Sequence, residues 1–95
     1  MHVISRKALR DFEARHPDAG APLGIWHRIA RKAVWKSLAS VRKTYPNADL
    51  VGSYTVFNIK GNSYRLIVKI EYQLGLIFIK HVLTHADYDK GVWKK

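Results

Sequence analysis

The chain has 95 residues, a length that suits one folded domain and leaves too little material for two hydrophobic cores. It carries 17 Lys and Arg against 7 Asp and Glu, a formal net charge of +10, and it contains no cysteine. Disulfides and thiolate metal sites are therefore excluded, and the charge favours a polyanionic partner, nucleic acid first and an acidic protein second. The alternative is a generally cationic surface that keeps the protein in solution.

Two further properties of the composition bear on its place in the cell. No apolar run has the length of a signal peptide, and nowhere do about 18 uninterrupted apolar residues occur. We therefore expect a soluble, cytoplasmic protein without a membrane partner. Residues 1–95 are expected to form a single domain.

The first twenty residues predict a short edge strand, a helix and a turn. Residues 2–4 could form the strand, and Ser5 stands where a helix N-cap would. An apolar stripe then runs through Ala8, Leu9 and Phe12 until His16-Pro17 ends the helix. Asp18-Ala19-Gly20 is expected to be a turn.

A second helix is expected next, with Pro22 near its first turn. Helical spacing predicts that it buries Trp26, Ile29, Ala30, Ala33 and Val34. Its opposite face carries His27, Arg28, Arg31 and Lys32. Residues 37–45 predict a third, short helix that Pro46-Asn47 ends. Residues 19–48 contain no acid, so this basic stretch, which includes Arg42 and Lys43, belongs to the folded domain.

After Asp49 the apolar period changes from about 3.6 to 2, which predicts an antiparallel meander. Strands are expected at residues 55–59, 64–72 and 76–83, with turns at residues 60–62 and 73–75. The fold class is therefore α+β, with N-terminal helices packed on one face of a small antiparallel sheet.

The long strand at residues 64–72 alternates between two faces. Its even positions are apolar and would meet the helices, whereas its odd positions are Arg65, Ile67, Lys69 and Glu71. Arg65 and Lys69 would then project from an open sheet face and could contact phosphates. The alternative is that both are ordinary solvent-facing residues, with Glu71 partly balancing Lys69.

A metal site is the first chemistry that the C-terminal stretch THADYDKG raises. His81 and His85 are four residues apart, with Asp87 and Asp89 beyond them. A spacing of four brings two histidines together on a helix, but His81 lies in a predicted strand. We therefore expect no metal site, and the sequence has no phosphate-binding glycine loop or serine-nucleophile motif.

Acid–base chemistry on RNA is the remaining possibility. It needs a base for the 2′-hydroxyl, an acid for the leaving 5′-oxygen and a cation for the phosphorane. If residues 86–90 form a helical turn, His85 meets Tyr88 at i+3 and Asp89 at i+4. Asp89 would orient His85, and Tyr88 would hydrogen-bond or stack on a base. Alternatively, Asp87 and Asp89 simply favour a helix start, and Tyr88 is a core residue.

Two segments, VFNIKGNSYRLIVKIEY (residues 56–72) and IKHVLTHADYDKG (residues 79–91), resemble the HigB toxins of the RelE/ParE-like superfamily. The opening MHVISRKALRDFEARHPDA and the helix around residues 26–35 fit the same pattern. The resemblance implies a RelE-like fold and a type II toxin that cleaves mRNA, mainly in the ribosomal A site, without metal or other cofactor. It also implies, as partners, a HigA-like helix-turn-helix antitoxin, mRNA and the ribosome with its rRNA.

The matching motif positions are Asn58, Asn62, Arg65, Thr84, His85, Tyr88, Asp89 and Lys90. On this resemblance we expect a catalytic group of Arg65, His85, Tyr88 and Asp89. Substrate binding is expected from Asn58, Asn62, Lys69, Lys90, Arg28, Arg31 and Lys32. Lys69 departs from the pattern, in which many relatives carry a small residue. Two rival functions are a ParE-like toxin directed at gyrase and an RNA-binding module without catalysis.

Overall fold

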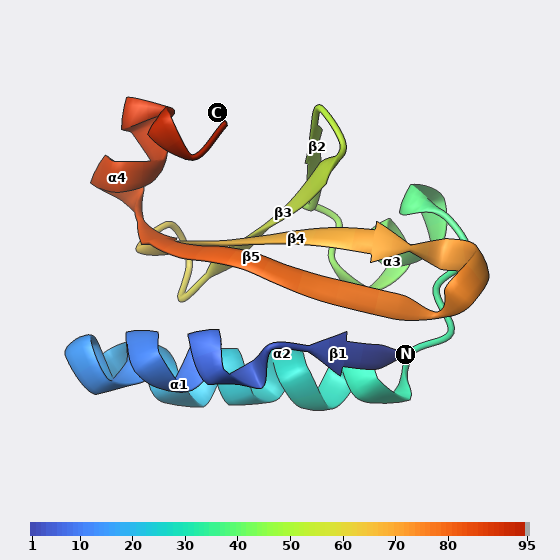
Figure 1. Cartoon of the computed structure of the whole chain (residues 1–95), viewed down its shortest axis with the longest axis horizontal. Coiled ribbons are helices and arrows are strands. Elements are labelled where there is room, and N and C mark those ends of the chain that lie inside the picture. Colours follow the sequence, from blue (N-terminus) through green and yellow to red (C-terminus); the bar gives the residue numbers. More distant parts are fainter. Residues whose placement is uncertain (95) are drawn as a thin grey trace.

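A five-stranded sheet, in the order β1-β5-β4-β3-β2, organises the chain (Figure 1). The structure is a computed structural model and describes residues 1–94. The strands are β1 (His2–Ile4), β2 (Asp49–Val51), β3 (Tyr54–Ile59), β4 (Tyr64–Glu71) and β5 (Leu76–Thr84). The helices are α1 (Arg6–Arg15), α2 (Gly20–Lys32), α3 (Leu38–Thr44) and α4 (His85–Lys90). Single 3₁₀ turns occupy Pro17–Ala19, Tyr72–Leu74 and Val92–Lys94.

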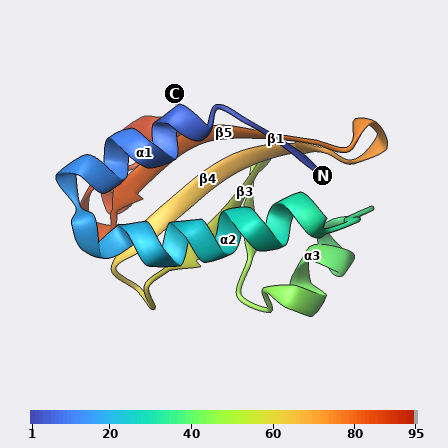
Figure 2. The same ribbon diagram turned by 90° about the horizontal axis from the view of Figure 1, so that it is seen from below.

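The expected fold class is confirmed. Strands β2 to β5 pair antiparallel, and β1 joins the sheet parallel to β5. Helices α1 and α2 cover one face of the sheet (Figure 2). The core between them centres on Trp26, Phe57 and Leu66, all at most 1% exposed, and the Trp26 and Phe57 rings meet edge-on at 5.4 Å. The alternation of β4 directs its even residues into this core, as predicted.

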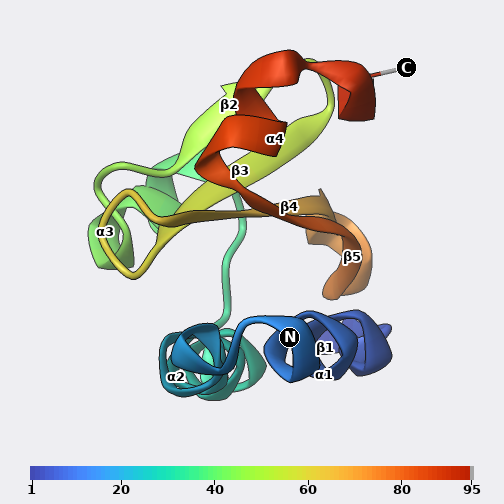
Figure 3. The ribbon, with the colours of Figure 1, turned by 90° about the vertical axis from the view of Figure 1, so that its left-hand side faces the viewer.

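The sequence had indicated that the other face of the sheet is open, and this is wrong for part of its length. Ile67 is fully buried there, in a small cluster with Val56 and Trp93. The cause is the C-terminal segment, because α4 and the turn after it fold back over this face (Figures 1 and 3). The pairing of β4 with β5 also shifts between Ile67 and Val68, which marks a β-bulge.

Helix α2 is shorter than its apolar period predicts. It ends at Lys32, Ala33 is extended with ψ 151°, and Val34 is 77% exposed instead of buried. The N-terminal ammonium of Met1 donates to the carbonyl oxygens of Ala30, Arg31 and Ala33 at 3.1, 2.9 and 2.8 Å. A cation at the last carbonyls stabilises the end of a helix. The end of α2 is therefore in contact with a segment about 30 residues away along the chain, and such a contact cannot be read from the apolar period of the helix.

Other boundaries also differ from the expectations. The predicted turn at Asp18 to Gly20 is a 3₁₀ turn followed directly by α2, and Tyr72 leaves the sheet for another 3₁₀ turn. Strand β2 was not predicted. Ser5 is at the N-cap of α1, but its φ is 77° and its side chain makes no capping bond. Ser37, by contrast, caps α3 by accepting from the backbone N–H of Ser40.

The β3–β4 hairpin is tied to the helical layer through Asp18. The carboxylate accepts from the Lys60 ammonium and from the Tyr64 hydroxyl, each at 2.6 Å. The hydrogen bond from Lys60, and next that from Tyr64, hold the pKa of Asp18 below its usual value. In the hairpin loop, Lys60 and Gly61 both take positive φ, 52° and 62°. These contacts fix the strand start from which Arg65 projects.

Candidate active site

The β3–β4 hairpin positions the first half of the site. Asn58 and Arg65 are cross-strand partners, so their side chains leave the same sheet face. The Arg65 guanidinium donates from one nitrogen to the carbonyl oxygens of Asn62 and Tyr64, at 3.2 and 3.3 Å. Asn62 therefore acts here through its backbone. Arg65 is half-buried, and its side chain is directed by its own hairpin.

Helix α4 positions the second half. Thr84 caps it, since the Thr84 hydroxyl accepts from the backbone N–H of Asp87 at 3.1 Å. The backbone N–H of His85 donates to the carbonyl of Ser63 at 3.1 Å, which joins the helix start to the hairpin. His85 Nε2 lies 3.2 Å from the Asp89 carboxylate, so the expected i,i+4 pair is confirmed. Both side chains are accessible, with exposed fractions of 49% and 65%.

Arg65 and α4 meet through Tyr88. The Arg65 guanidinium carbon lies 5.4 Å from the centroid of the Tyr88 ring, within the range of a cation–π contact. The same ring stacks on Trp93 with centroids 5.2 Å apart, and the Trp93 indole N–H donates to the Tyr88 carbonyl at 3.0 Å. Tyr88 is thus held by protein groups, and its ring links the arginine to the helix that carries His85 and Asp89.

A hollow of about 390 Å³ lies beside Arg65 and Tyr88. Asn58 from β3 lines it, and so does Arg42 from α3. His85 and Asp89 are not among its lining residues, although they belong to the same short helix as Tyr88. Arg42 was noted in the sequence as part of a basic stretch but was not assigned to the site. No sequence signal placed it there, because its position depends on how α3 returns to the sheet.

The structure does not bring the other expected residues into this hollow. Lys69 is four residues along β4 from Arg65 and pairs with Glu71 at 3.5 Å, which is the balancing contact that the alternative interpretation named. Lys90 pairs with Asp87 at 3.6 Å on the exposed side of α4.

Arg28, Arg31 and Lys32, here called the basic helix face, lie on α2, across the sheet from α4 (Figure 3). None of these three residues lines the hollow beside Arg65.

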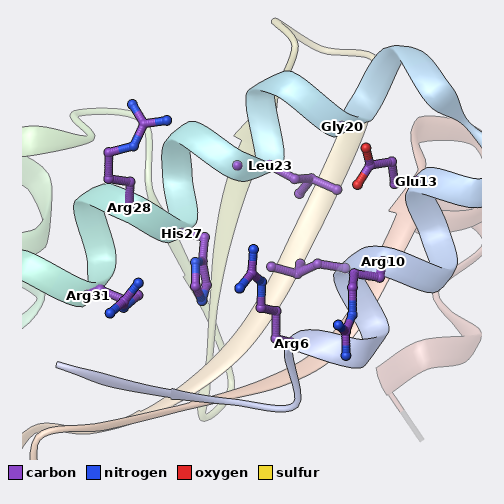
Figure 4. Close-up of a pocket in the computed structure, with 10 residues that line it drawn as sticks. Arg6, Arg10, Glu13, Gly20, Leu23, His27, Arg28 and Arg31 are labelled. Atoms are coloured by element: carbon purple, nitrogen blue, oxygen red, sulfur yellow. The ribbon is translucent and has the colours of Figure 1, made fainter.

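A second cationic feature lies between α1 and α2 (Figure 4). It is a cleft of about 250 Å³, to which Arg6, Arg28 and Arg31 contribute guanidinium groups and Glu13 a carboxylate. Burial, then the charges of Arg6 and Arg31, lowers the pKa of His27 in this cleft. The lining of this cleft includes neither Arg65 nor any residue of α4, so it is separate from the hollow beside Arg65.

Two kinds of feature are absent from residues 1–94, the part of the chain that the structure describes. Within that range, no group of three or more His, Cys, Asp or Glu side chains is close enough to hold a metal ion. None of the helices described there is long and apolar enough to cross a bilayer. Among the described residues, the hollow brings together the side chains of Arg65, Arg42 and Tyr88, and the exposed imidazole of His85 lies on the same helix as Tyr88.

The protein is thus a small basic α+β domain in which an arginine, an aromatic ring and a His–Asp pair gather over one face of the sheet. Residues 19–91 match the HigB toxin family, described as the RelE-like toxic component of a toxin–antitoxin system. The match covers more than half of the chain, and the protein belongs to this family. A toxic component of such a system has an antitoxin as its partner.

Curated relatives agree with the family assignment. The chain is 28% identical over 92 residues to the mRNA interferase toxin HigB of Escherichia coli K12, covering 94% of this chain and 88% of the relative. It is 28% identical to the mRNA interferase HigB of Shigella flexneri, with the same coverage. It is 27% identical over 93 residues to the mRNA interferase HigB of E. coli O6:H1, covering 95% and 90%.

Proposed function

We propose that this protein is a type II toxin that cleaves mRNA bound to the ribosome, without a metal ion, and so blocks translation in the cytoplasm. The relatives named as mRNA interferases support the substrate. The observation that carries the mechanism is the contact of Arg65 with Tyr88, on the helix that bears the His85–Asp89 pair. A cation for the phosphate and a group that exchanges protons are thereby provided within one connected unit.

In the proposed reaction, the 2′-hydroxyl of the RNA attacks the adjacent phosphorus and the bond to the 5′-oxygen breaks. The products are a cyclic phosphate and a 5′-hydroxyl, and the proton lost by the 2′-hydroxyl is balanced by the one gained at the 5′-oxygen. Arg65 stabilises the charge that develops on the phosphorane, and His85, oriented by Asp89, takes part in proton transfer. Tyr88 supports Arg65 and offers its hydroxyl to the substrate.

The remaining expected residues are proposed to bind RNA. Asn58 lines the hollow, whereas Asn62, Lys69 and Lys90 lie outside its lining and are proposed to contact parts of the RNA strand beyond it. The basic helix face is proposed to contact the ribosome, because it points away from the hollow and would meet a different part of a large polyanion. A HigA-like helix-turn-helix protein is the proposed antitoxin.

The test is brief induction in cells, followed by mapping of the 5′ ends of mRNA. We expect new ends within coding sequence and arrest of translation, and we expect Arg65→Ala to lose both. Loss of one preorganised donor to a developing anion costs about 10²–10³ in rate. Arg15→Ala, which removes an arginine from α1 outside the site, is the matched control. A folded Arg65→Ala variant that stays fully toxic would refute the role of Arg65.

Two other outcomes separate the rival functions. Growth arrest with intact mRNA and a DNA-damage response would favour the gyrase-directed alternative. RNA binding in vitro without new 5′ ends or growth arrest would favour the non-catalytic alternative.

A further inference from the structure

The hollow beside Arg65 contains a second guanidinium from a different element. Arg42 leaves the last turn of α3, whereas Arg65 leaves β4, and both line the same space of about 390 Å³. One carboxylate, that of Asp49, also lines it and accepts from the backbone N–H of Leu50 at 2.9 Å. Two guanidinium groups against one carboxylate give the hollow a net positive charge, which suits an anion carrying more than one phosphate.

The Arg42 side chain is anchored through its Nε atom by a backbone carbonyl of the loop that follows α3. Its Nε donates to the carbonyl oxygen of Ala48 at 2.9 Å, and Ala48 is buried at 3% exposure. A guanidinium has five N–H donors, so fixing Nε leaves the four terminal ones for a ligand. Among residues 1–94, no hydrogen bond or ion pair engages those terminal nitrogens. The bond from Nε to the loop after α3 therefore restrains the Arg42 side chain and directs its guanidinium fork toward the hollow, which lowers the entropy cost of ordering it when a ligand binds.

Arg65 differs from Arg42 in its contacts. It donates to two backbone carbonyls of its own hairpin and lies over the Tyr88 ring, which connects it to α4 and to the proposed chemistry. Arg42 has no described contact with α4. The two arginines are thus anchored to separate parts of the fold, and we propose that Arg42 is a substrate-binding residue that holds a second phosphate of the RNA strand, adjacent to the one that Arg65 neutralises.

This inference rests on the proposed ribonuclease function and adds a subsite to it. A residue that binds a neighbouring phosphate acts equally in the ground state and the transition state, so its loss raises KM and leaves kcat nearly unchanged. Loss of Arg65, in contrast, lowers kcat. A purely structural role for Arg42, tying α3 to Ala48, would change stability and would not change the salt dependence of KM.

The experiment measures kcat and KM for mRNA cleavage on programmed ribosomes with Arg42→Gln, Arg42→Lys and Lys43→Gln. Lys43 is the matched control, because it is exposed on the same helix, carries the same charge and does not line the hollow. We expect Arg42→Gln to raise KM about tenfold, with kcat within twofold of wild type, and to reduce the slope of log KM against log salt by about 0.7. Arg42→Lys should fall between, because it keeps the charge and loses the fork. Lys43→Gln should leave KM within twofold.

The other possible results of this experiment would each overturn the proposed role of Arg42. An unchanged KM for a folded Arg42→Gln variant overturns the inference, as does an equal rise for Lys43→Gln, which would indicate general attraction. A fall in kcat at constant KM would place Arg42 in the chemical step and also overturn it. If Arg42→Gln does not fold, a wild-type KM for Arg42→Lys refutes the fork. Wild-type protein that cleaves no message would refute the proposed function itself and this subsite with it.

Discussion

The His85–Asp89 pair makes a prediction in which two substitutions differ in magnitude. His85→Gln removes the group that exchanges protons while keeping approximate size and hydrogen bonding. Loss of general acid–base help costs about 10²–10⁴ in rate. Asp89→Asn removes the charge that faces His85 Nε2 across 3.2 Å. The two side chains are 49% and 65% exposed, so solvent screens the pair.

The effect of Asp89 follows from that exposure. An exposed i,i+4 ion pair contributes about 0.3–0.5 kcal/mol, and about 1.4 kcal/mol corresponds to a tenfold change in rate. Asp89→Asn should therefore slow cleavage about twofold if Asp89 acts by orienting His85 alone. Asp87→Asn is the matched control, because it makes the same change in the same helix, where Asp87 pairs with Lys90 and not with His85.

The assay is single-turnover cleavage of message on programmed ribosomes, with ribosome binding measured in parallel. We expect the His85→Gln variant to bind normally and cleave at least a hundredfold more slowly. Near-wild-type cleavage by that variant would remove His85 from the mechanism. If Asp89→Asn were as damaging as His85→Gln, the inference from exposure would be wrong, and Asp89 would itself contact the substrate. Weakened binding with an unchanged chemical step would make His85 a positioning residue.

Three further predictions concern binding and stability. Charge reversal of the basic helix face should weaken ribosome binding and flatten its salt dependence, whereas an unchanged salt slope would make this face an ordinary solvated surface. Asp18→Asn should destabilise the protein at neutral pH, measured by urea unfolding. Because the folded-state pKa of Asp18 is lowered, the difference in unfolding free energy from wild type should shrink as pH falls below about 3.8. A constant difference down to pH 2 would refute this. Trp93→Ala should cost about 3–5 kcal/mol of unfolding free energy, since Trp93 is 4% exposed. Val34→Ala should cost at most about 0.5 kcal/mol, since Val34 is 77% exposed. Similar costs for the two variants would contradict the observed burial.

The sequence by itself determined those features that depend on neighbours along the chain. Alternation along β4 identified which residues enter the main core, because successive side chains of a strand point to opposite faces. The i,i+4 spacing in α4 identified the contact of His85 with Asp89, because helical geometry places such residues together. The short apolar period likewise predicted a helix at residues 37–45, and the structure has α3 at Leu38–Thr44 with Ser37 as its N-cap.

The tertiary structure decided which segment covers which surface. The period of β4 indicated that Ile67 faces away from the helices, but it carried no information about Trp93, 26 residues further on, which buries it. The period of α2 continued through Val34, although the Met1 ammonium binds the carbonyls at the end of the helix before that point. Arg42 and Arg65 also line one hollow only because α3 and β4, which are far apart in the sequence, meet in the folded chain. Local periodicity fixes the orientation of a side chain relative to its own element, whereas contacts between distant elements depend on how the whole chain closes.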